Sequence, residues 1–224
     1  MSFIIDFFAA SDNPNSLGAK FRSKRQKDFE ALFYKKFSKD KPIRILDVGG
    51  TDYFWKNSSI PDIPNTKITL LNIHQEFSDH PNIVGIQGDA TSMLEFDTYS
   101  FDLIFSNSVI EHLYTFENQQ KMANEVMRVG KYFFIQTPNK YFPVEAHYAL
   151  PFAQFYPKSL TYFLLTKTKL SRLKNWNPQD AQQYLEEIRL LDEQQMRSLF
   201  PRTEIYQEKV MGLIKSISAH NLSV

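Results

Sequence analysis

The 224-residue sequence predicts an α/β fold in which a mostly parallel sheet lies between two layers of helices. Its candidate strands are short runs that are apolar throughout, which is typical of strands covered on both faces. From residue 43 onward these runs alternate with helical or polar stretches, as the crossovers of a parallel sheet require. Small, polar or acidic residues follow each of the first five runs. The strand ends therefore form one polar edge of the predicted sheet.

Composition and charge narrow the class of protein. The chain has 26 lysine and arginine residues against 25 aspartate and glutamate residues, a formal net charge of +1. Nucleic-acid binders usually carry a strong basic excess, so we expect no nucleic-acid partner. The absence of cysteine excludes disulfides, thiolate metal sites and a cysteine nucleophile. Asp6 interrupts the apolar start, no basic residue precedes it, and no apolar run reaches membrane-spanning length. We expect a single cytoplasmic domain over residues 1–224.

The first predicted element is a helix over residues 17–40 with one buried face. Basic residues lie between its apolar positions and favour a solvated face, with an anionic partner as the alternative. These basic residues are Lys20, Arg22, Lys24, Arg25 and Lys27.

Five candidate strands follow, and two more close the chain. They are residues 43–48, 68–72, 83–87, 101–106, 131–136, 204–209 and 213–219. A short helix fits at 51–56, and a longer one over 116–129 ends at Gly130, a candidate C-cap. Asp192 and Gln195 have the spacing of a capping box and predict a helix that stops at Pro201.

Residues 138–200 break the alternation and predict an inserted lid that is rich in aromatic residues. It carries Tyr141, Phe142, Tyr148, Phe152, Phe155, Tyr156, Tyr162 and Phe163. These side chains could line an acceptor pocket or simply form the core of the insertion. A helix is expected from Lys158 to Trp176. Its 158–174 portion is basic and amphipathic, so peripheral membrane contact is an alternative to an ordinary lid helix.

The turn after the first strand is the most informative part of the sequence. Ile45-Leu46-Asp47-Val48-Gly49-Gly50 ends an apolar run with an acid and two of only seven glycines. Two missing Cβ atoms allow a sharp turn and let backbone N–H groups approach a ligand. In open parallel sheets, ligands bind beyond the carboxyl ends of the strands. We therefore expect a polar ligand at this edge.

The order and spacing of several motifs resemble the class I S-adenosylmethionine-dependent methyltransferases, in their small-molecule (type 11-like) branch. The resemblance covers the chain from about residue 17 to the end. It is carried by residues 45–50, by Gly88-Asp89-Ala90, by residues 101–113, by Thr137-Pro138-Asn139 and by residues 212–216. The resemblance implies a Rossmann-like three-layer sandwich with a seven-stranded sheet whose last strand is antiparallel.

The resemblance also implies a binding site for S-adenosylmethionine. Asp47, Gly49 and Gly50 would hold the methionine portion, and Ser106 would lie beside it. Asn72 would face the ribose hydroxyls and Asp89 the adenine amino group. The neighbouring Ile73 and Ala90 complete the expected cofactor contacts.

Two departures from the family pattern leave other functions open. Thr51 and Asp52 follow Gly50 where the family has a longer glycine turn, and Asn72 replaces a carboxylate. A neutral hydrogen bond in place of a charged one costs about 1 kcal/mol, which weakens binding several-fold. The alternative is a catalytically silent protein of the same fold. A nicotinamide-dependent oxidoreductase fits less well, because the third glycine of that fingerprint is missing.

The expected reaction is methylation of a small-molecule acceptor on oxygen or nitrogen, with a lipid, glycan or natural product as the acceptor. A base is needed if a hydroxyl must lose its proton. His112 is the first candidate base and His147 the second, although either side chain could be purely structural. No histidine spacing in the sequence is typical of metal ligands, so no metal is expected.

Overall fold

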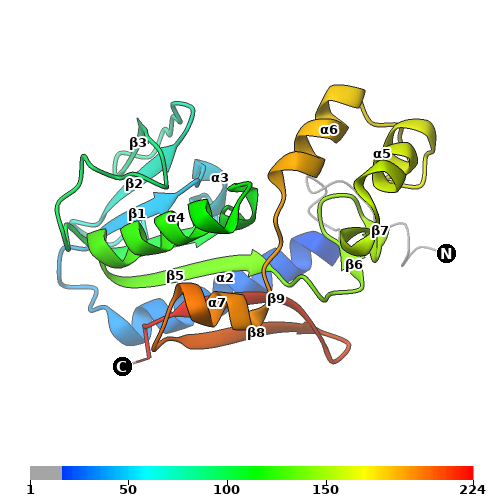
Figure 1. Cartoon of the computed structure of the whole chain (residues 1–224). Helices are drawn as coiled ribbons and strands as arrows, with labels where there is room; N and C mark the ends of the chain where they lie inside the picture. Colours follow the sequence, from blue (N-terminus) through cyan, green and yellow to red (C-terminus); the bar gives the residue numbers. More distant parts are fainter. Residues whose placement is uncertain (1–16, 224) are drawn as a thin grey trace.

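A computed structural model describes residues 17–223 and shows a seven-stranded sheet with a smaller body beside it (Figure 1). The strand order is β3-β2-β1-β4-β5-β9-β8. Strands β1 to β5 run parallel, and β9 is antiparallel to both of its neighbours. The strands are β1 Arg44–Val48, β2 Lys67–Asn72, β3 Ile83–Gln87, β4 Phe101–Asn107, β5 Gly130–Pro138, β8 Glu204–Val210 and β9 Leu213–His220. The predicted three-layer fold with an antiparallel strand is confirmed.

Helices cover both faces of this sheet, which explains the continuous apolar runs. Helix α2 (Leu17–Lys36) packs Phe29 and Phe33 on the face that includes Ile45. Helices α4 (Phe116–Val129) and α7 (Glu193–Leu199) pack on the opposite face with Leu46. The short helix α3 (Asp52–Trp55) joins the α2 side through Trp55. Successive residues of a strand point into different hydrophobic cores. The residues on both faces of the strand must therefore be apolar.

Two predicted helix ends can be compared with the structure. The capping box at Asp192 and Gln195 is present at the start of α7. Gly130 follows α4 as expected, but its backbone is extended, with φ −107°. A Cβ at Gly130 would lie 2.3 Å from Ile104 Cγ1. Close packing of β5 against β4 therefore explains this glycine, whereas a left-handed helix cap does not.

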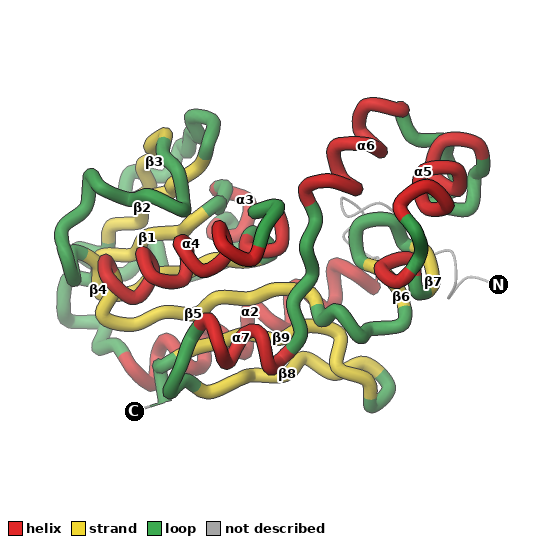
Figure 2. The backbone as a smooth tube through the Cα atoms, in the orientation of Figure 1, coloured by secondary structure: helices red, strands yellow, loops and turns green. Residues whose placement is uncertain are grey.

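The smaller body contains two helices and a short hairpin (Figure 2). It comprises β6 Val144–Glu145, β7 Leu150–Pro151, the 3-10 turn Ala153–Phe155, α5 Lys158–Lys167 and α6 Pro178–Glu187. These elements share their own core, which includes Tyr148, Leu165 and Leu185. We call residues 139–190 the lid.

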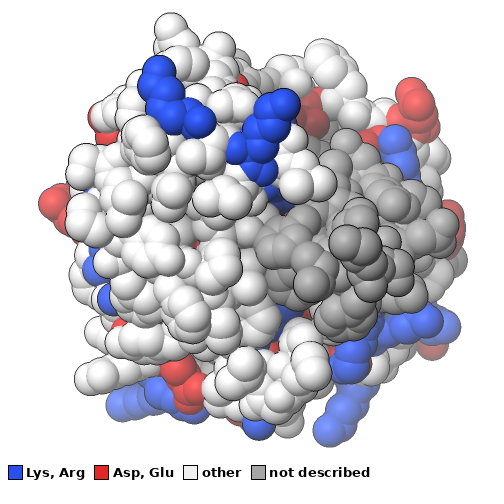
Figure 3. Space-filling model, turned by 90° about the vertical axis from the view of Figure 1, so that its right-hand side faces the viewer, with Lys and Arg blue, Asp and Glu red and all other residues white. Residues whose placement is uncertain are grey.

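The long helix expected from Lys158 to Trp176 is corrected by the structure. Helix α5 ends at Lys167, so Leu170 and Leu173 lie outside it and the basic amphipathic helix over 158–174 does not form. On the face of the molecule seen in Figure 3, lysine and arginine side chains are scattered among uncharged ones. Within residues 17–223, no helix combines the length and the apolar character needed to cross a bilayer.

Candidate functional site

The turn after β1 requires both of its glycines. Gly49 has φ +73°, and its N–H donates to the Leu71 carbonyl at 2.7 Å, which ties the turn to β2. A Cβ on Gly50 would lie 1.9 Å from Asp47 Oδ2. No side chain fits there unless the buried carboxylate moves. The backbone of this turn therefore stays open to a ligand.

Asp47 is buried beneath the turn with one oxygen satisfied. Trp55 Nε1 donates a 2.8 Å hydrogen bond to Oδ2, whereas Oδ1 has no partner among the described residues. Burial raises the pKa of Asp47 to about 7, although the Trp55 hydrogen bond opposes that rise. An unpartnered, desolvated carboxylate oxygen favours a cationic donor such as an ammonium group.

A cavity of about 450 Å³ opens over this turn. We call it the donor cavity. Asp47, Gly49, Gly50 and Thr51 form one side, and Asn107 lies at the end of β4. Residues of α2 close the other side, namely Arg22, Ser23, Arg25 and Gln26. The volume is within the range of small-molecule sites.

The remaining predicted cofactor residues lie at the same sheet edge but do not line that cavity. Asn72 reaches the turn, since its Nδ2 lies 3.5 Å from the Gly50 carbonyl, and its Oδ1 accepts from Ile73 N–H at 2.8 Å. The Ile73 side chain is exposed. Asp89 is exposed and accepts two hydrogen bonds from Thr91, and Ala90 is half-buried beside it. The end of β2 thus contacts the turn that lines the cavity.

The structure does not support a cofactor contact for Ser106. Its side chain is fully buried, and its hydroxyl donates to the Val48 carbonyl at 2.9 Å, joining β4 to β1. Asn107, the next residue, lines the donor cavity instead. Asn107 faces the cavity where Ser106 does not, because adjacent strand residues point to opposite faces.

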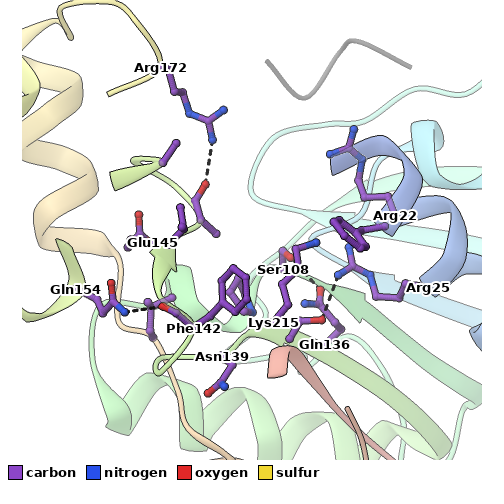
Figure 4. A pocket seen from close by; sticks show the side chains of 17 residues that line it. Arg22, Arg25, Ser108, Gln136, Asn139, Phe142, Glu145, Gln154, Arg172 and Lys215 are labelled. Atoms are coloured by element: carbon purple, nitrogen blue, oxygen red, sulfur yellow. Dashed lines mark hydrogen bonds between the residues drawn. The ribbon is translucent and has the colours of Figure 1, made fainter. Parts of the chain in front are cut away.

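A second cavity, of about 200 Å³, lies between α2, the β5 and β9 strands and the lid (Figure 4). We call it the acceptor cavity. Arg22 and Arg25 line both cavities, which are therefore neighbours. Further polar lining comes from Ser108, Gln136, Asn139, Glu145, Gln154, Arg172 and Lys215. Gln136 is buried, and its Nε2 has no partner among the described residues.

The environment of Arg25 in the acceptor cavity differs from the solvated helix face that the sequence predicts. Arg25 is not on a solvated face, since it is buried and pairs with Glu208 of β8 at 3.3 Å. Burial lowers the pKa of Lys215 to about 8, against the pull of Glu208 at 3.9 Å. No sequence pattern signals the Arg25–Glu208 pair, whose members are 183 positions apart. The resemblance at residues 212–216 did point to the Lys215 segment.

Few of the predicted lid aromatics line the acceptor cavity. Phe142 does so, joined by Phe21 from α2. Tyr148 is buried in the lid core, whereas the Tyr141 and Phe163 side chains are more than half exposed. Most of these aromatics therefore build or cover the lid, which was the alternative expectation.

Folding brings the two candidate bases together. The rings of His112 and His147 lie 5.0 Å apart, centroid to centroid. His112 Nδ1 contacts Glu187 Oε1 at 2.5 Å, and His147 Nδ1 contacts Glu145 Oε1 at 2.7 Å. Burial lowers the pKa of His147, but its hydrogen bond to Glu145 and the charge of that carboxylate outweigh burial and raise it. Because Glu145 and Ala146 line the acceptor cavity, the pair lies beside it.

Glu111 lies next to this histidine pair and was not predicted as a site residue. Its carboxylate is fully buried, and Thr137 Oγ1 donates to Oε2 at 2.9 Å. Burial raises the pKa of Glu111, opposed by the charges of His147 and His112. Ligand atoms of Glu111, His112 and His147 all lie within 4.8 Å of one another. The linear spacing that predicted no metal site gave no sign of this cluster.

Comparisons with known proteins agree with this geometry. A family model described as a methyltransferase domain matches residues 61–132, which span β2 to β5. This match covers about a third of the chain and agrees with its resemblance to the class I S-adenosylmethionine-dependent methyltransferases. No curated protein matches this chain in sequence.

Solved structures are similar in fold. The CurJ carbon methyltransferase is 11% identical with a TM-score of 0.58, over 92% of this chain and 55% of that chain. This chain thus spans about half the length of that structure. A methyltransferase from Methanosarcina mazei is 12% identical with a TM-score of 0.50, over 84% of this chain and 95% of that chain. A Rhodobacter sphaeroides structure named for Zn-dependent alcohol dehydrogenases is 12% identical, TM-score 0.52, over 88% of each. Such likenesses show the fold and not the reaction.

The residues of the donor cavity fit S-adenosylmethionine, the cofactor of this family. The bare Oδ1 of Asp47 suits the ammonium of its methionine portion. Gly50 has no Cβ, and its backbone lines the cavity. The departures noted in the sequence do not close the cavity, because Thr51 lines it and Asn72 remains at its rim.

Proposed function

We propose that this methyltransferase transfers a methyl group from S-adenosylmethionine in the donor cavity to a small molecule in the acceptor cavity. The observation that carries the proposal is the shared wall of Arg22 and Arg25, which makes the two cavities neighbours. Reactants held side by side gain much of the benefit of an intramolecular reaction, up to ~7–11 kcal/mol.

The residues of the donor cavity, and those that follow β2 and β3 at the same sheet edge, would act by binding and orienting the cofactor. Asp47 would pair with the methionine ammonium, and the Gly49–Gly50 backbone would approach the carboxylate. The Asn72 amide would bond the ribose hydroxyls, and Asp89 the adenine amino group, with Ile73 and Ala90 against the base. When bound, S-adenosylmethionine supplies an electrophilic methyl group on a positively charged sulfur.

The acceptor would be a lipid, glycan or natural product methylated on oxygen or nitrogen. Its lone pair forms the new bond to the methyl carbon while the sulfur–methyl bond breaks and S-adenosylhomocysteine leaves. A hydroxyl acceptor also loses its proton, and we assign that deprotonation to the His112–His147 pair. The pair suits this role because each Nδ1 is bonded to a carboxylate, which leaves Nε2 able to face an acceptor.

The proposed setting is a single-domain protein of the cytoplasm, with neither nucleic acid nor membrane as a partner. A cysteine-free chain with a formal charge of +1 supports that setting. The lid, which lies within the predicted insertion over residues 138–200, would form the acceptor side of the site.

A second candidate function is binding of the cofactor without turnover, and Asn72 favours it. Both ends of its amide already contact the backbone, at Gly50 and Ile73, which leaves less capacity for a ribose. This protein would keep the donor cavity and transfer nothing.

Transfer of a tritiated methyl group from S-adenosylmethionine into fractionated cell extracts tests the proposal. We expect label in a small-molecule fraction, suppressed by S-adenosylhomocysteine and missing with a Gly50→Ala variant. If the wild-type chain binds S-adenosylmethionine by calorimetry yet labels nothing in any extract, the silent alternative is favoured.

A further inference from the structure

Glu111, His112 and His147 form a cluster of side chains that can bind a metal ion. Its ligand atoms come from a 3-10 turn after β4 (Ile110–His112) and from the lid segment between β6 and β7. They lie within 4.8 Å of one another. Tetrahedral ligands bound at about 2.0–2.2 Å stand roughly 3.5 Å apart, so a shift of up to about 1.3 Å closes the set.

The two histidines have the carboxylate partners that metal-binding histidines usually have. Each Nδ1 is bonded to its own carboxylate, Glu187 for His112 and Glu145 for His147. A carboxylate partner fixes the proton on Nδ1 and leaves the Nε2 lone pair available. Among the described side chains, no hydrogen bond occupies Nε2 of either ring.

The buried carboxylate of Glu111 is a second, independent observation that favours a metal ion at this cluster. Glu111 has no exposed surface, and its Oε1 has no partner among the described residues, although Thr137 satisfies Oε2. A buried carboxylate oxygen that has no hydrogen-bond partner is unfavourable. Two more carboxylates, Glu145 and Glu187, stand behind the rings. The nearby Arg172 instead donates to the carbonyls of Ala146 and His147. A cation at the centre would satisfy all three ligand atoms.

We propose that Glu111, His112 and His147 bind one divalent transition-metal ion. Two imidazole nitrogens and one carboxylate oxygen suit Zn²⁺ and similar ions and disfavour Mg²⁺ or Ca²⁺, which prefer oxygen ligands alone. Three protein ligands leave a coordination position open.

The role of the ion rests on the proposed methyl transfer, whereas its binding does not. Glu145 and Ala146 line the acceptor cavity and directly precede His147, so an ion bound by His147 would lie beside that cavity. A coordinated hydroxyl has a lowered pKa and gives up its proton to water. Its oxygen then forms the bond to the methyl carbon as the sulfur–methyl bond breaks. The histidines would thus assist deprotonation as ligands.

Calorimetric titration of the chelator-treated full chain with Zn²⁺ tests the binding. We expect one ion per chain and at least a 10-fold loss of affinity in each of Glu111→Gln, His112→Asn and His147→Asn. Co²⁺ should give a visible absorption band that these variants lose. His74→Asn is the matched control, because His74 is exposed in a loop and should leave both signals unchanged.

Wild-type protein provides a measurement that does not depend on how variants fold. Zn²⁺ should protect His112 and His147, but not His74, from modification by diethyl pyrocarbonate, read by peptide mass spectrometry. The proposal is overturned if Zn²⁺ fails to bind at one ion per chain, or if it protects neither histidine. S-adenosylmethionine binding and methyl transfer are measured on the same samples. Metal binding without methyl transfer would therefore count against the proposed function alone.

Discussion

The donor and acceptor cavities lie on either side of the same two arginines, yet they are built differently. Neighbouring residues of one turn, Asp47 to Thr51, form one side of the donor cavity, and the sheet core supports them. The acceptor cavity draws its wall from α2, β5, β9 and the lid, over positions 21 to 216. The lid has a separate hydrophobic core. Binding of the donor should therefore depend on a local motif, and binding of the acceptor on how distant elements dock.

The largest expected effect comes from filling the donor turn. Gly50→Ala would place a Cβ 1.9 Å from Asp47 Oδ2, so the turn or the buried carboxylate must move. We expect affinity for S-adenosylmethionine to fall at least 1,000-fold, about 4 kcal/mol, by calorimetry.

The matched control for that change is Gly212→Ala in the β8–β9 turn. Nothing lies within 4 Å of a Cβ there, although φ is +83° and costs some stability. It should bind S-adenosylmethionine as the wild type does. Equal affinity of the Gly50→Ala variant would show that the turn does not hold the donor.

The buried Asp47 predicts an unusual pH dependence for the ligand-free protein. Its pKa rises from 3.8 to about 7 on folding, so between these values the folded state binds more protons than the unfolded state. The free energy of unfolding should therefore fall as pH rises from about 4 to about 7, by up to about 4 kcal/mol. Urea unfolding across this range measures it. Asp47→Asn should reduce that slope, and the share due to the buried Glu111 should remain. An unchanged slope would exclude Asp47 as a source.

The independence of the lid can be tested with a cavity in its core. Leu165 is fully buried among lid residues, so Leu165→Ala should cost about 2–4 kcal/mol. Hydrogen exchange should rise in residues 139–190, while affinity for S-adenosylmethionine stays within two-fold. Leu160→Ala, at a 43% exposed position of the same helix, serves as the control. Loss of donor affinity with Leu165→Ala would show that the two cavities are coupled.

The smallest effect concerns Ser106. Ser106→Ala removes its hydrogen bond to the Val48 carbonyl and should cost about 1 kcal/mol in urea unfolding. Affinity for S-adenosylmethionine should not change. A ten-fold weaker affinity with unaltered stability would restore the cofactor contact that the sequence predicted for this residue.

Most of the sheet could be predicted from the sequence, for a physical reason. Strands such as β1 are buried on both faces, so their residues must be apolar in an unbroken run. Helix α4 and the Asp192 capping box were equally clear, because their signals are local. Helix α6 was missed although Asn177 caps it and Pro178 begins it. The helix is short and buries few side chains, among them Ala181 and Leu185.

In the candidate site, too, local features could be predicted from the sequence and long-range contacts could not. Asp47, Gly49 and Gly50 lie in one motif, and the structure brings them together at the donor cavity. His112 and His147 were singled out separately, but their contact across 35 positions depends on how the lid docks. The Arg25–Glu208 pair could not be predicted, because charge alternation along α2 looks the same whether one arginine is buried or solvated.

The place of β9 in the sheet also bears on synthesis of the protein. Lys215 and Ser216 line the acceptor cavity from this strand, which pairs with β5 about 80 positions earlier. The donor cavity needs only residues 22 to 107. A nascent chain emerging from the ribosome therefore has the parts of its donor site well before those of its acceptor site, and the second becomes complete only once translation has passed residue 216.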